Sequence, residues 1–174
     1  AIKYHCHMRI NRLYAGGRDP EYIQKYKEGM HKVFDLLLES EWVMWPNFIM
    51  ESTYPLWNRP ENPNACGKCF IAIDPNGSVR SCNGDCSTNI GHITTHSRMS
   101  DFTFSHRWSA KNLPECSDCD HVVYCQSGCP FVRKLAYGTY NKRTPFCEAF
   151  KTLFPRLMEL TNKWKKQHEL MQLE

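Results

Sequence analysis

The spacing of the cysteines constrains the fold of this chain more than any other feature of its sequence. Ten cysteines occur in 174 residues, and nine of them lie between positions 66 and 147. A chain of this length buries a core without disulfide staples. We therefore expect the cysteines to bind metal or to carry out chemistry. In chain order the nine are Cys66-x2-Cys69, Cys82-x3-Cys86, Cys116-x2-Cys119-x5-Cys125-x3-Cys129 and Cys147.

Three kinds of structure use closely spaced cysteines. Disulfide scaffolds are typical of secreted proteins, but the sequence shows no signal peptide and nine is an odd number. Structural zinc sites draw their ligands from C-x2-C pairs, and the C-x5-C-x3-C run departs from that pattern. Iron–sulfur clusters are held by cysteine thiolates. The spacing favours iron–sulfur clusters, and a zinc-stabilised binding module without a redox role is the alternative.

The first 57 residues contain one of the ten cysteines and read as a β–α–β segment. Residues 2–11 alternate with period two, which predicts a strand. Asp19 followed by Pro20 predicts a helix start, and apolar residues at helical spacing extend that helix to about residue 39. The run 42–50 predicts one or two short buried strands. The polar face of the first strand carries His5, His7, Arg9 and Asn11.

The remaining chain begins with the Pro- and Asn-rich stretch 58–64. Asn76-Gly77 between two strand-like runs, 70–73 and 78–81, predicts a β-hairpin. Residues 83–113 are polar, and we expect them to be irregular. From Pro145 onward the pattern predicts a helix that Pro155 kinks or splits in two. Its apolar face would consist of Phe146, Phe150, Leu153, Leu157, Leu160 and Trp164.

Composition and charge limit the range of partners. Apolar residues make up 41% of the chain and charged residues 23%, which is ordinary for a folded domain. A net charge of +4 is too small to indicate nucleic acid. No run of 18 apolar residues occurs, so we expect no membrane partner. Thiolate chemistry and the lack of a visible signal peptide predict a cytoplasmic location.

The cysteine pattern resembles that of the SPASM domain, the C-terminal extension of many radical S-adenosylmethionine enzymes. Cys66-x10-Gly77-x4-Cys82 matches the first part of the family pattern. The run from Cys116 to Cys129 matches the second part, and Cys147 matches its last cysteine. The resemblance covers residues 66–147, and the segment 2–57 looks like the end of the radical enzyme's partial barrel. It implies an α+β chain, with a terminal β–α piece of a partial (β/α) barrel at 1–57, a loop-rich SPASM domain with a β-hairpin at 58–150 and a C-terminal helix at 151–174.

The resemblance also implies a ligand set for two auxiliary [4Fe-4S] clusters. Cluster I would use Cys66, Cys69, Cys82 and Cys129, and cluster II would use Cys116, Cys119, Cys125 and Cys147. Nine cysteines face eight positions, so Cys86 competes with Cys69 for the fourth position of cluster I, unless that iron is left open. We favour Cys69, because it shares a turn with Cys66. Lys68, Arg80 and Arg133 are candidates to offset the clusters' negative charge.

A missing motif limits what this chain does alone. The C-x3-C-x2-C triplet, which in this family holds the catalytic cluster, does not occur. Because one β–α unit is not a sensible domain by itself, we expect a C-terminal fragment that is inactive alone. S-adenosylmethionine and its own cluster would belong to the missing N-terminal barrel, which becomes the main partner. In that barrel His5, His7, Arg9 and Asn11 would face cosubstrate or peptide, unless the strand is an exposed edge.

The substrate class rests on one departure from a family pattern. Sulfatase-maturing enzymes carry a carboxylate proton acceptor directly after the cysteine that matches Cys82. This chain has Asn83 there, and an amide does not accept a proton at neutral pH. Formylglycine formation is therefore the less favoured alternative. We expect instead the modification of a peptide or protein, by thioether or carbon–carbon crosslinking.

Overall fold

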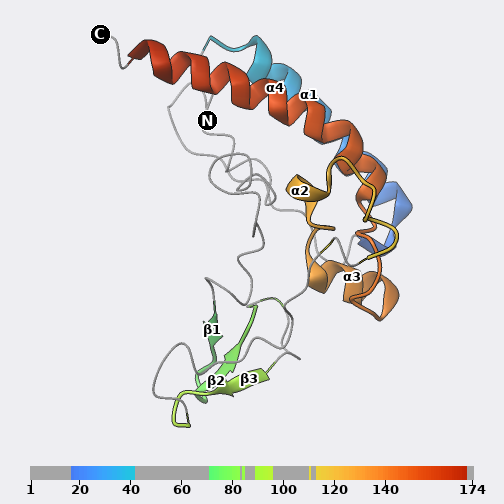
Figure 1. Cartoon of the computed structure of the whole chain (residues 1–174), viewed down its shortest axis with the longest axis vertical. Helices are drawn as coiled ribbons and strands as arrows, with labels where there is room; N and C mark the ends of the chain where they lie inside the picture. The colour runs from blue at the N-terminus through green and yellow to red at the C-terminus, as the bar shows by residue number, and fades with distance from the viewer. Residues whose placement is uncertain are drawn as a thin grey trace.

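The described part of the chain is an α+β structure of four helices and one small antiparallel sheet. The computed structural model describes residues 17–41, 71–82, 84, 89–95, 110 and 113–171. The predicted strands at 2–11 and 42–50 lie outside these residues. Figure 1 shows the two long helices together at one end and the sheet at the other.

Helix α1 spans Pro20–Glu39, the range that the sequence predicts. Asp19 is its N-cap and accepts a hydrogen bond from the Glu21 N–H at 2.9 Å. Pro20 occupies the first turn, where its missing N–H costs nothing. The helix ends at Ser40, which adopts an extended conformation and whose hydroxyl donates a hydrogen bond to the Leu37 carbonyl.

Helix α4 spans Cys147–Met171 without a break. Pro155 lies inside this one helix, so the predicted split is wrong, whereas the alternative, a kink, stays a prediction. Pro155 is exposed, so the carbonyl that loses its backbone donor can turn toward water. Leu153 and Leu157 on either side are fully buried, and their burial offsets the lost hydrogen bond.

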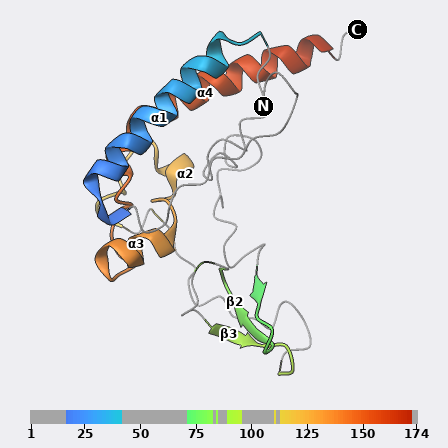
Figure 2. The same ribbon diagram turned by 180° about the vertical axis from the view of Figure 1, so that it is seen from behind.

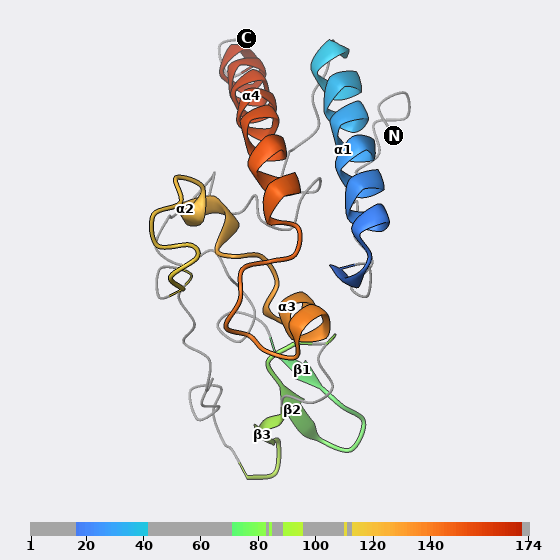
Figure 3. The ribbon, with the colours of Figure 1, turned by 90° about the vertical axis from the view of Figure 1, so that its right-hand side faces the viewer.

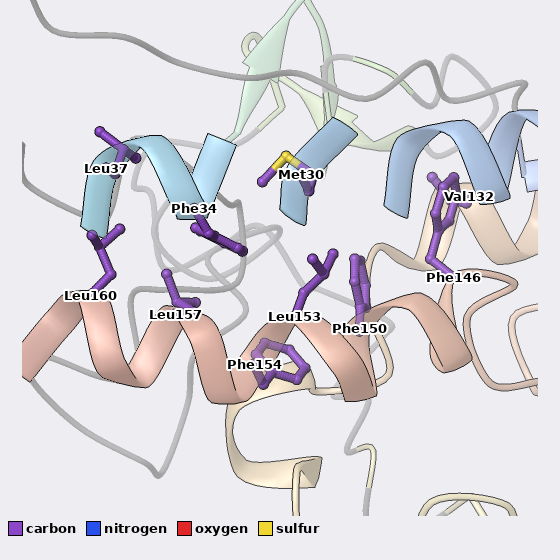
Figure 4. Packing of buried hydrophobic residues seen from close by; sticks show 10 residues of the cluster. All are labelled: Met30, Phe34, Leu37, Val132, Phe146, Phe150, Leu153, Phe154, Leu157 and Leu160. Carbon is purple, nitrogen blue, oxygen red and sulfur yellow. The ribbon is translucent and has the colours of Figure 1, made fainter. Parts of the chain in front are cut away.

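Helices α1 and α4 lie side by side and run in the same direction (Figure 3). His31 contacts Thr152, Asp35 pairs with Arg156 and Lys163 binds the Leu38 carbonyl, so the contacts advance along both helices together. Figure 4 shows the apolar faces meeting. The cluster of buried side chains consists of Met30, Phe34, Leu37, Val132, Phe146, Phe150, Leu153, Phe154, Leu157 and Leu160. Both apolar faces that the sequence predicts are thus confirmed.

The predicted hairpin is present as β1, Ala72–Ile73, and β2, Ser78–Arg80. The strands pair antiparallel, with Ile73 opposite Val79. Gly77 has a positive φ of 87°, and its N–H donates to the Asp74 carbonyl to close the turn. The neighbouring Asn76 side chain accepts from the Ser78 N–H, which is a local contact that favours turns.

A third strand, β3 at Asn89–His92, corrects the prediction that 83–113 is irregular throughout. It pairs antiparallel with β2, with a shift of register between Val79 and Arg80. The strand consists of Asn, Ile, Gly and His, which lack the alternation that marks a strand in sequence. Pairing with β2, rather than local preference, therefore makes it a strand.

Two short helices connect the sheet region to α4. Helix α2 spans Val122–Cys125, and α3 spans Pro130–Tyr137 and ends at Gly138. Seen from behind in Figure 2, they lie near the beginning of α1 and α4. Arg18 donates a hydrogen bond to the Leu135 carbonyl, which joins α3 to the residues just before α1.

Candidate metal centre

The structure describes six of the eight predicted cluster ligands. Cys66, Cys69 and the competing Cys86 lie outside the described residues, as do His5, His7, Arg9, Asn11 and Lys68. None of the described cysteines forms a disulfide. They are Cys116, Cys119, Cys125, Cys129 and Cys147 in the segment before and at α4, and Cys82 after β2.

Cys116 and Cys119 belong to a series of tight turns that leads to α2. The Cys119 N–H donates to the Cys116 carbonyl at 3.2 Å, and the Val122 N–H donates to the Cys119 carbonyl at 2.9 Å. A backbone bond from residue i to residue i+3 closes a turn in which the two side chains come near each other. The C-x2-C spacing therefore produces here the tight turn that a shared metal needs. Cys116 is buried and Cys119 is partly buried.

The turn after Cys125 brings backbone N–H groups to the cysteine sulfur. Gln126, Ser127 and Gly128 all have positive φ, at 46°, 60° and 68°. This conformation is uncommon for Gln and Ser, and consecutive left-handed residues aim backbone N–H groups at one point. The N–H groups of Ser127 and Gly128 donate to the Cys125 sulfur and lower its pKa. Hydrogen bonds of this kind favour the charged form of the sulfur.

Thiols from three separate segments interact around Cys125. Burial raises the pKa of the Cys125 thiol to about 12, and Cys147 and Cys116 raise it further by like charge. Like-charge effects of this kind require short separations. The protein therefore holds Cys125 as a neutral thiol beside two others.

Cys147 begins helix α4 and has cationic neighbours. Burial raises the pKa of its thiol, whereas Arg143 and Lys151 lower it. The Arg143 guanidinium lies 3.9 Å from the Cys147 sulfur and 3.3 Å from a Glu148 carboxylate oxygen. The backbone N–H of Arg143 also donates to Glu115, which ties the start of α4 to the turn that carries Cys116.

A fully buried arginine lies beside these cysteines. Arg133 of α3 has no exposed surface. Its Nη1 donates to the Ser127 hydroxyl at 3.1 Å and to the Lys142 carbonyl at 3.3 Å. Burial lowers the pKa of Arg133 to about 10, while Cys129, Cys116 and Cys125 raise it. The side chain is therefore a cation at neutral pH, within electrostatic range of three cysteine sulfurs.

Cys82 lies apart in sequence, after the hairpin. The Gly84 N–H donates to its sulfur at 3.3 Å, the kind of hydrogen bond that favours a thiolate. Arg80, another candidate to offset cluster charge, pairs with Asp74 within the hairpin.

Within the described ranges, no three His, Cys, Asp or Glu side chains are close enough to one another to hold a metal ion. The donor chemistry nevertheless suits a metal that prefers sulfur, because Cys116 and Cys147 act electrostatically on Cys125 and the buried cation Arg133 lies nearby. Sites of this kind commonly close only when the metal binds, since the binding free energy also folds the loops. None of the helices described here is long and apolar enough to cross a membrane.

Sequence reasoning missed two features of this region. It did not predict the left-handed turn at 126–128, although Ser127-Gly128 after a short apolar run is a turn signal. It named Arg133 only as one of three possible counter-charges. The start of α3 could have been found, since Pro130 at the first position and Gly138 after the last are typical of helix ends.

Compared with known proteins, the chain matches no family model, no curated protein and no solved structure. The resemblance to the SPASM domain therefore stays a prediction from the cysteine pattern.

Proposed function

We propose that this chain is the auxiliary iron–sulfur part of a radical S-adenosylmethionine enzyme that modifies a peptide or protein substrate. The observation that carries the proposal is that Cys116 and Cys147, from two other segments, both act electrostatically on the buried thiol of Cys125. These residues come from a turn, a short helix and the start of α4. The same three, with Cys119, are the ligands that the family pattern implies for cluster II.

The chain's own groups suit a thiolate-held cluster better than a set of inert buried thiols. Backbone N–H groups donate to the sulfurs of Cys125 and Cys82, and Arg133 offers positive charge without exposure to water. Inert buried cysteines require neither feature, because neutral thiols pack as small apolar groups. A bound [4Fe-4S] cluster would supply one-electron transfer, at a potential tuned by such hydrogen bonds and charges. S-adenosylmethionine would bind only in an N-terminal barrel.

Peptide modification is favoured over formylglycine formation by the residue that follows Cys82. Asn83 has no carboxylate and is not a proton acceptor at neutral pH. We infer thioether or carbon–carbon crosslinking of a peptide as the reaction of the parent enzyme. This inference rests on family analogy.

The test is iron and sulfide analysis of cysteine variants of the full chain, produced and kept without oxygen. Cys116→Ala, Cys125→Ala and Cys147→Ala are each expected to remove about four irons, one cluster's worth. Cys82→Ala and Cys129→Ala are expected to remove the other cluster and to leave the first intact. Ser117→Ala, a change within the Cys116–Cys119 turn, is the matched control and is expected to keep all the iron.

Two outcomes decide against parts of this proposal. Wild-type protein that contains zinc and no iron would support the zinc-stabilised binding module instead. Loss of about four irons on Cys86→Ala would assign Cys86, rather than Cys69, to cluster I.

A further inference from the structure

The turn of the β-hairpin contains Asn76-Gly77, a dipeptide with a chemistry of its own. The backbone nitrogen after an asparagine can attack the side-chain amide carbon, and glycine, which has no Cβ, hinders this attack least. The new nitrogen–carbon bond closes a cyclic imide, while the amide nitrogen takes up the backbone proton and leaves as ammonia. One water molecule then opens either carbon–nitrogen bond of the imide, which gives aspartate or isoaspartate. Asn76 is exposed, so water reaches it.

Hydrogen bonds hold both reacting groups of this turn. The Gly77 N–H, which carries the attacking nitrogen, donates to the Asp74 carbonyl at 2.8 Å. The side-chain oxygen of Asn76 accepts from the Ser78 N–H at 3.0 Å. The nitrogen must give up its bond to Asp74 and lose its proton before it attacks, and the two atoms must come into a near-attack geometry. The folded turn therefore slows the reaction.

His92 of β3 holds the peptide bond between the two residues. The Thr94 N–H donates to His92 Nδ1 at 3.3 Å, so the ring proton lies on Nε2. That nitrogen donates to the Asn76 carbonyl at 2.7 Å. Rotation about the Cα–C bond of Asn76 moves this carbonyl and the Gly77 nitrogen together, because the peptide bond is planar. The hydrogen bond from His92 therefore restricts the rotation that brings the nitrogen to the side chain.

β3 also covers Gly77 itself. A Cβ at Gly77 would lie 2.8 Å from His92 Nε2, so the imidazole ring lies against the glycine. The Ile93 N–H donates to the Gly77 carbonyl at 3.0 Å. β3 thus contacts the reactive peptide bond at Asn76 and the next carbonyl along the chain, and its separation from the turn releases both.

We propose that Asn76 is a deamidation site that β3 protects through His92, and that separation of β3 from the turn starts its conversion to aspartate or isoaspartate. The strands of the sheet are only two to four residues long, and elements with few contacts open locally more often than a whole chain unfolds. Isoaspartate adds a carbon to the backbone, which is incompatible with the present register of β1 and β2. The modification makes the opening irreversible. It involves no metal, so it is independent of the proposed function.

The experiment follows residue 76 in the full chain at neutral pH, by mass spectrometry of the peptide that contains it, with isoaspartate separated by chromatography. The wild type is expected to deamidate at least about tenfold more slowly than the same chain in urea, a factor that corresponds to one hydrogen bond of ordinary strength. Asn83-Gly84 is the second such dipeptide of the sequence. In urea it gives the reference rate for a pair without a folded turn.

Two substitutions of His92 test its role. His92→Ala removes the ring and its donor, and it is expected to raise the rate of the native chain by about tenfold. His92→Gln keeps an N–H donor and is expected to restore most of the protection. His31→Ala removes a histidine of α1 that contacts Thr152. This matched control is expected to leave the rate at Asn76 unchanged.

Equal rates in the native wild type and in urea would overturn the proposal, because the turn then gives no protection. A His92→Ala rate equal to that of the wild type would also overturn it, as would a His92→Gln rate as high as that of His92→Ala. If His92→Ala prevents the sheet from folding, the rates of His92→Gln and the wild type decide. A chain without iron would contradict the proposed function and leave this measurement unaffected.

Discussion

The helix pair and the cysteine-bearing segment of this chain are held together by different means. Helices α1 and α4, together with Val132 of α3 and Phe146 just before α4, contribute a cluster of ten buried apolar residues. The segment from 110 to 122 has a second cluster of only four, and one of these is Cys116. The first region has the apolar core of an ordinary small domain. The second has turns, thiols and a buried cation in its place.

The difference shows which region needs a ligand. Each buried Leu, Phe, Met or Val of the first cluster contributes about 1.5–3 kcal/mol of transfer free energy, so ten of them can hold two helices together. One cluster of four smaller residues cannot do the same for the turns, and Gln126 and Ser127 add backbone strain. We therefore expect the helix pair to persist without metal and the cysteine segment to depend on it.

Removal of metal is expected to have the largest effect and to affect only one region. Chelation of the iron in the full chain should unfold the segment 113–129, while amides of α1 and of the second half of α4 stay protected. Hydrogen exchange followed by mass spectrometry measures both regions in one sample. Equal protection of 113–129 before and after metal removal would contradict the comparison.

A cavity created in the helix pair is expected to lower the stability of the chain without changing its iron content. Leu157→Ala removes a fully buried side chain of α4 and should lower the free energy of unfolding by about 2–5 kcal/mol. Iron content should stay close to that of the wild type, because Leu157 lies ten residues beyond Cys147 in α4. Urea unfolding of the full chain measures the first effect and metal analysis the second.

Leu36→Ala is the matched control for this change. Leu36 of α1 is 63% exposed, so the same substitution should change stability by less than about 0.5 kcal/mol. A cost for Leu36→Ala as large as that for Leu157→Ala would show that the helix pair is not packed as described.

A substitution of Gly128, in the turn at 126–128, tests the cysteine-bearing segment in the same way. Gly128 has φ of 68°, and a Cβ there would lie 2.9 Å from the Thr144 Cβ. Gly128→Ala should therefore cost about 1–3 kcal/mol and also lower iron content, because the N–H groups that bind Cys125 move. Thermal unfolding and metal analysis of the variant check both effects.

Gly138→Ala separates backbone strain from crowding. Gly138 has a similar φ of 73°, but a Cβ there meets nothing within 4 Å. This variant should cost about 1 kcal/mol and keep its iron. Equal iron loss in both variants would remove the special role of the turn at 126–128.

The smallest expected effect concerns the far end of the helix pair. The Lys163 ammonium donates to the carbonyls of Leu38 and Ser40, at 2.6 and 2.5 Å, at the C-terminal end of α1. Lys163→Met should cost about 1 kcal/mol and change neither iron content nor protection of 113–129. Lys166→Met, at an exposed position of α4, should be neutral.

The two regions also differ in how far the sequence predicts them. The bounds of α1 and the apolar faces of both long helices follow from local signals, namely the Asp19 cap, Pro20 and apolar residues at helical spacing. The hairpin follows from Asn76-Gly77. In these elements the preference of each short segment agrees with the final fold.

The candidate site follows from sequence only in part. The C-x2-C turn at Cys116 is predictable because its geometry is local. β3 is not, since its pairing with β2 comes from contacts distant in sequence. The link from Arg133 through Ser127 to Cys125 is hidden for a similar reason, because an arginine is normally exposed and only the folded chain shows that this one is buried.

The central claim is that the cysteines of this chain hold iron–sulfur clusters. Its most direct test is analysis of iron, acid-labile sulfide and zinc in the full wild-type chain, purified without oxygen, together with its visible absorption. We predict a brown protein with about eight irons and about eight sulfides per chain, which corresponds to two [4Fe-4S] clusters. A colourless protein that contains zinc, or no metal at all after reconstitution with iron and sulfide, would contradict the account.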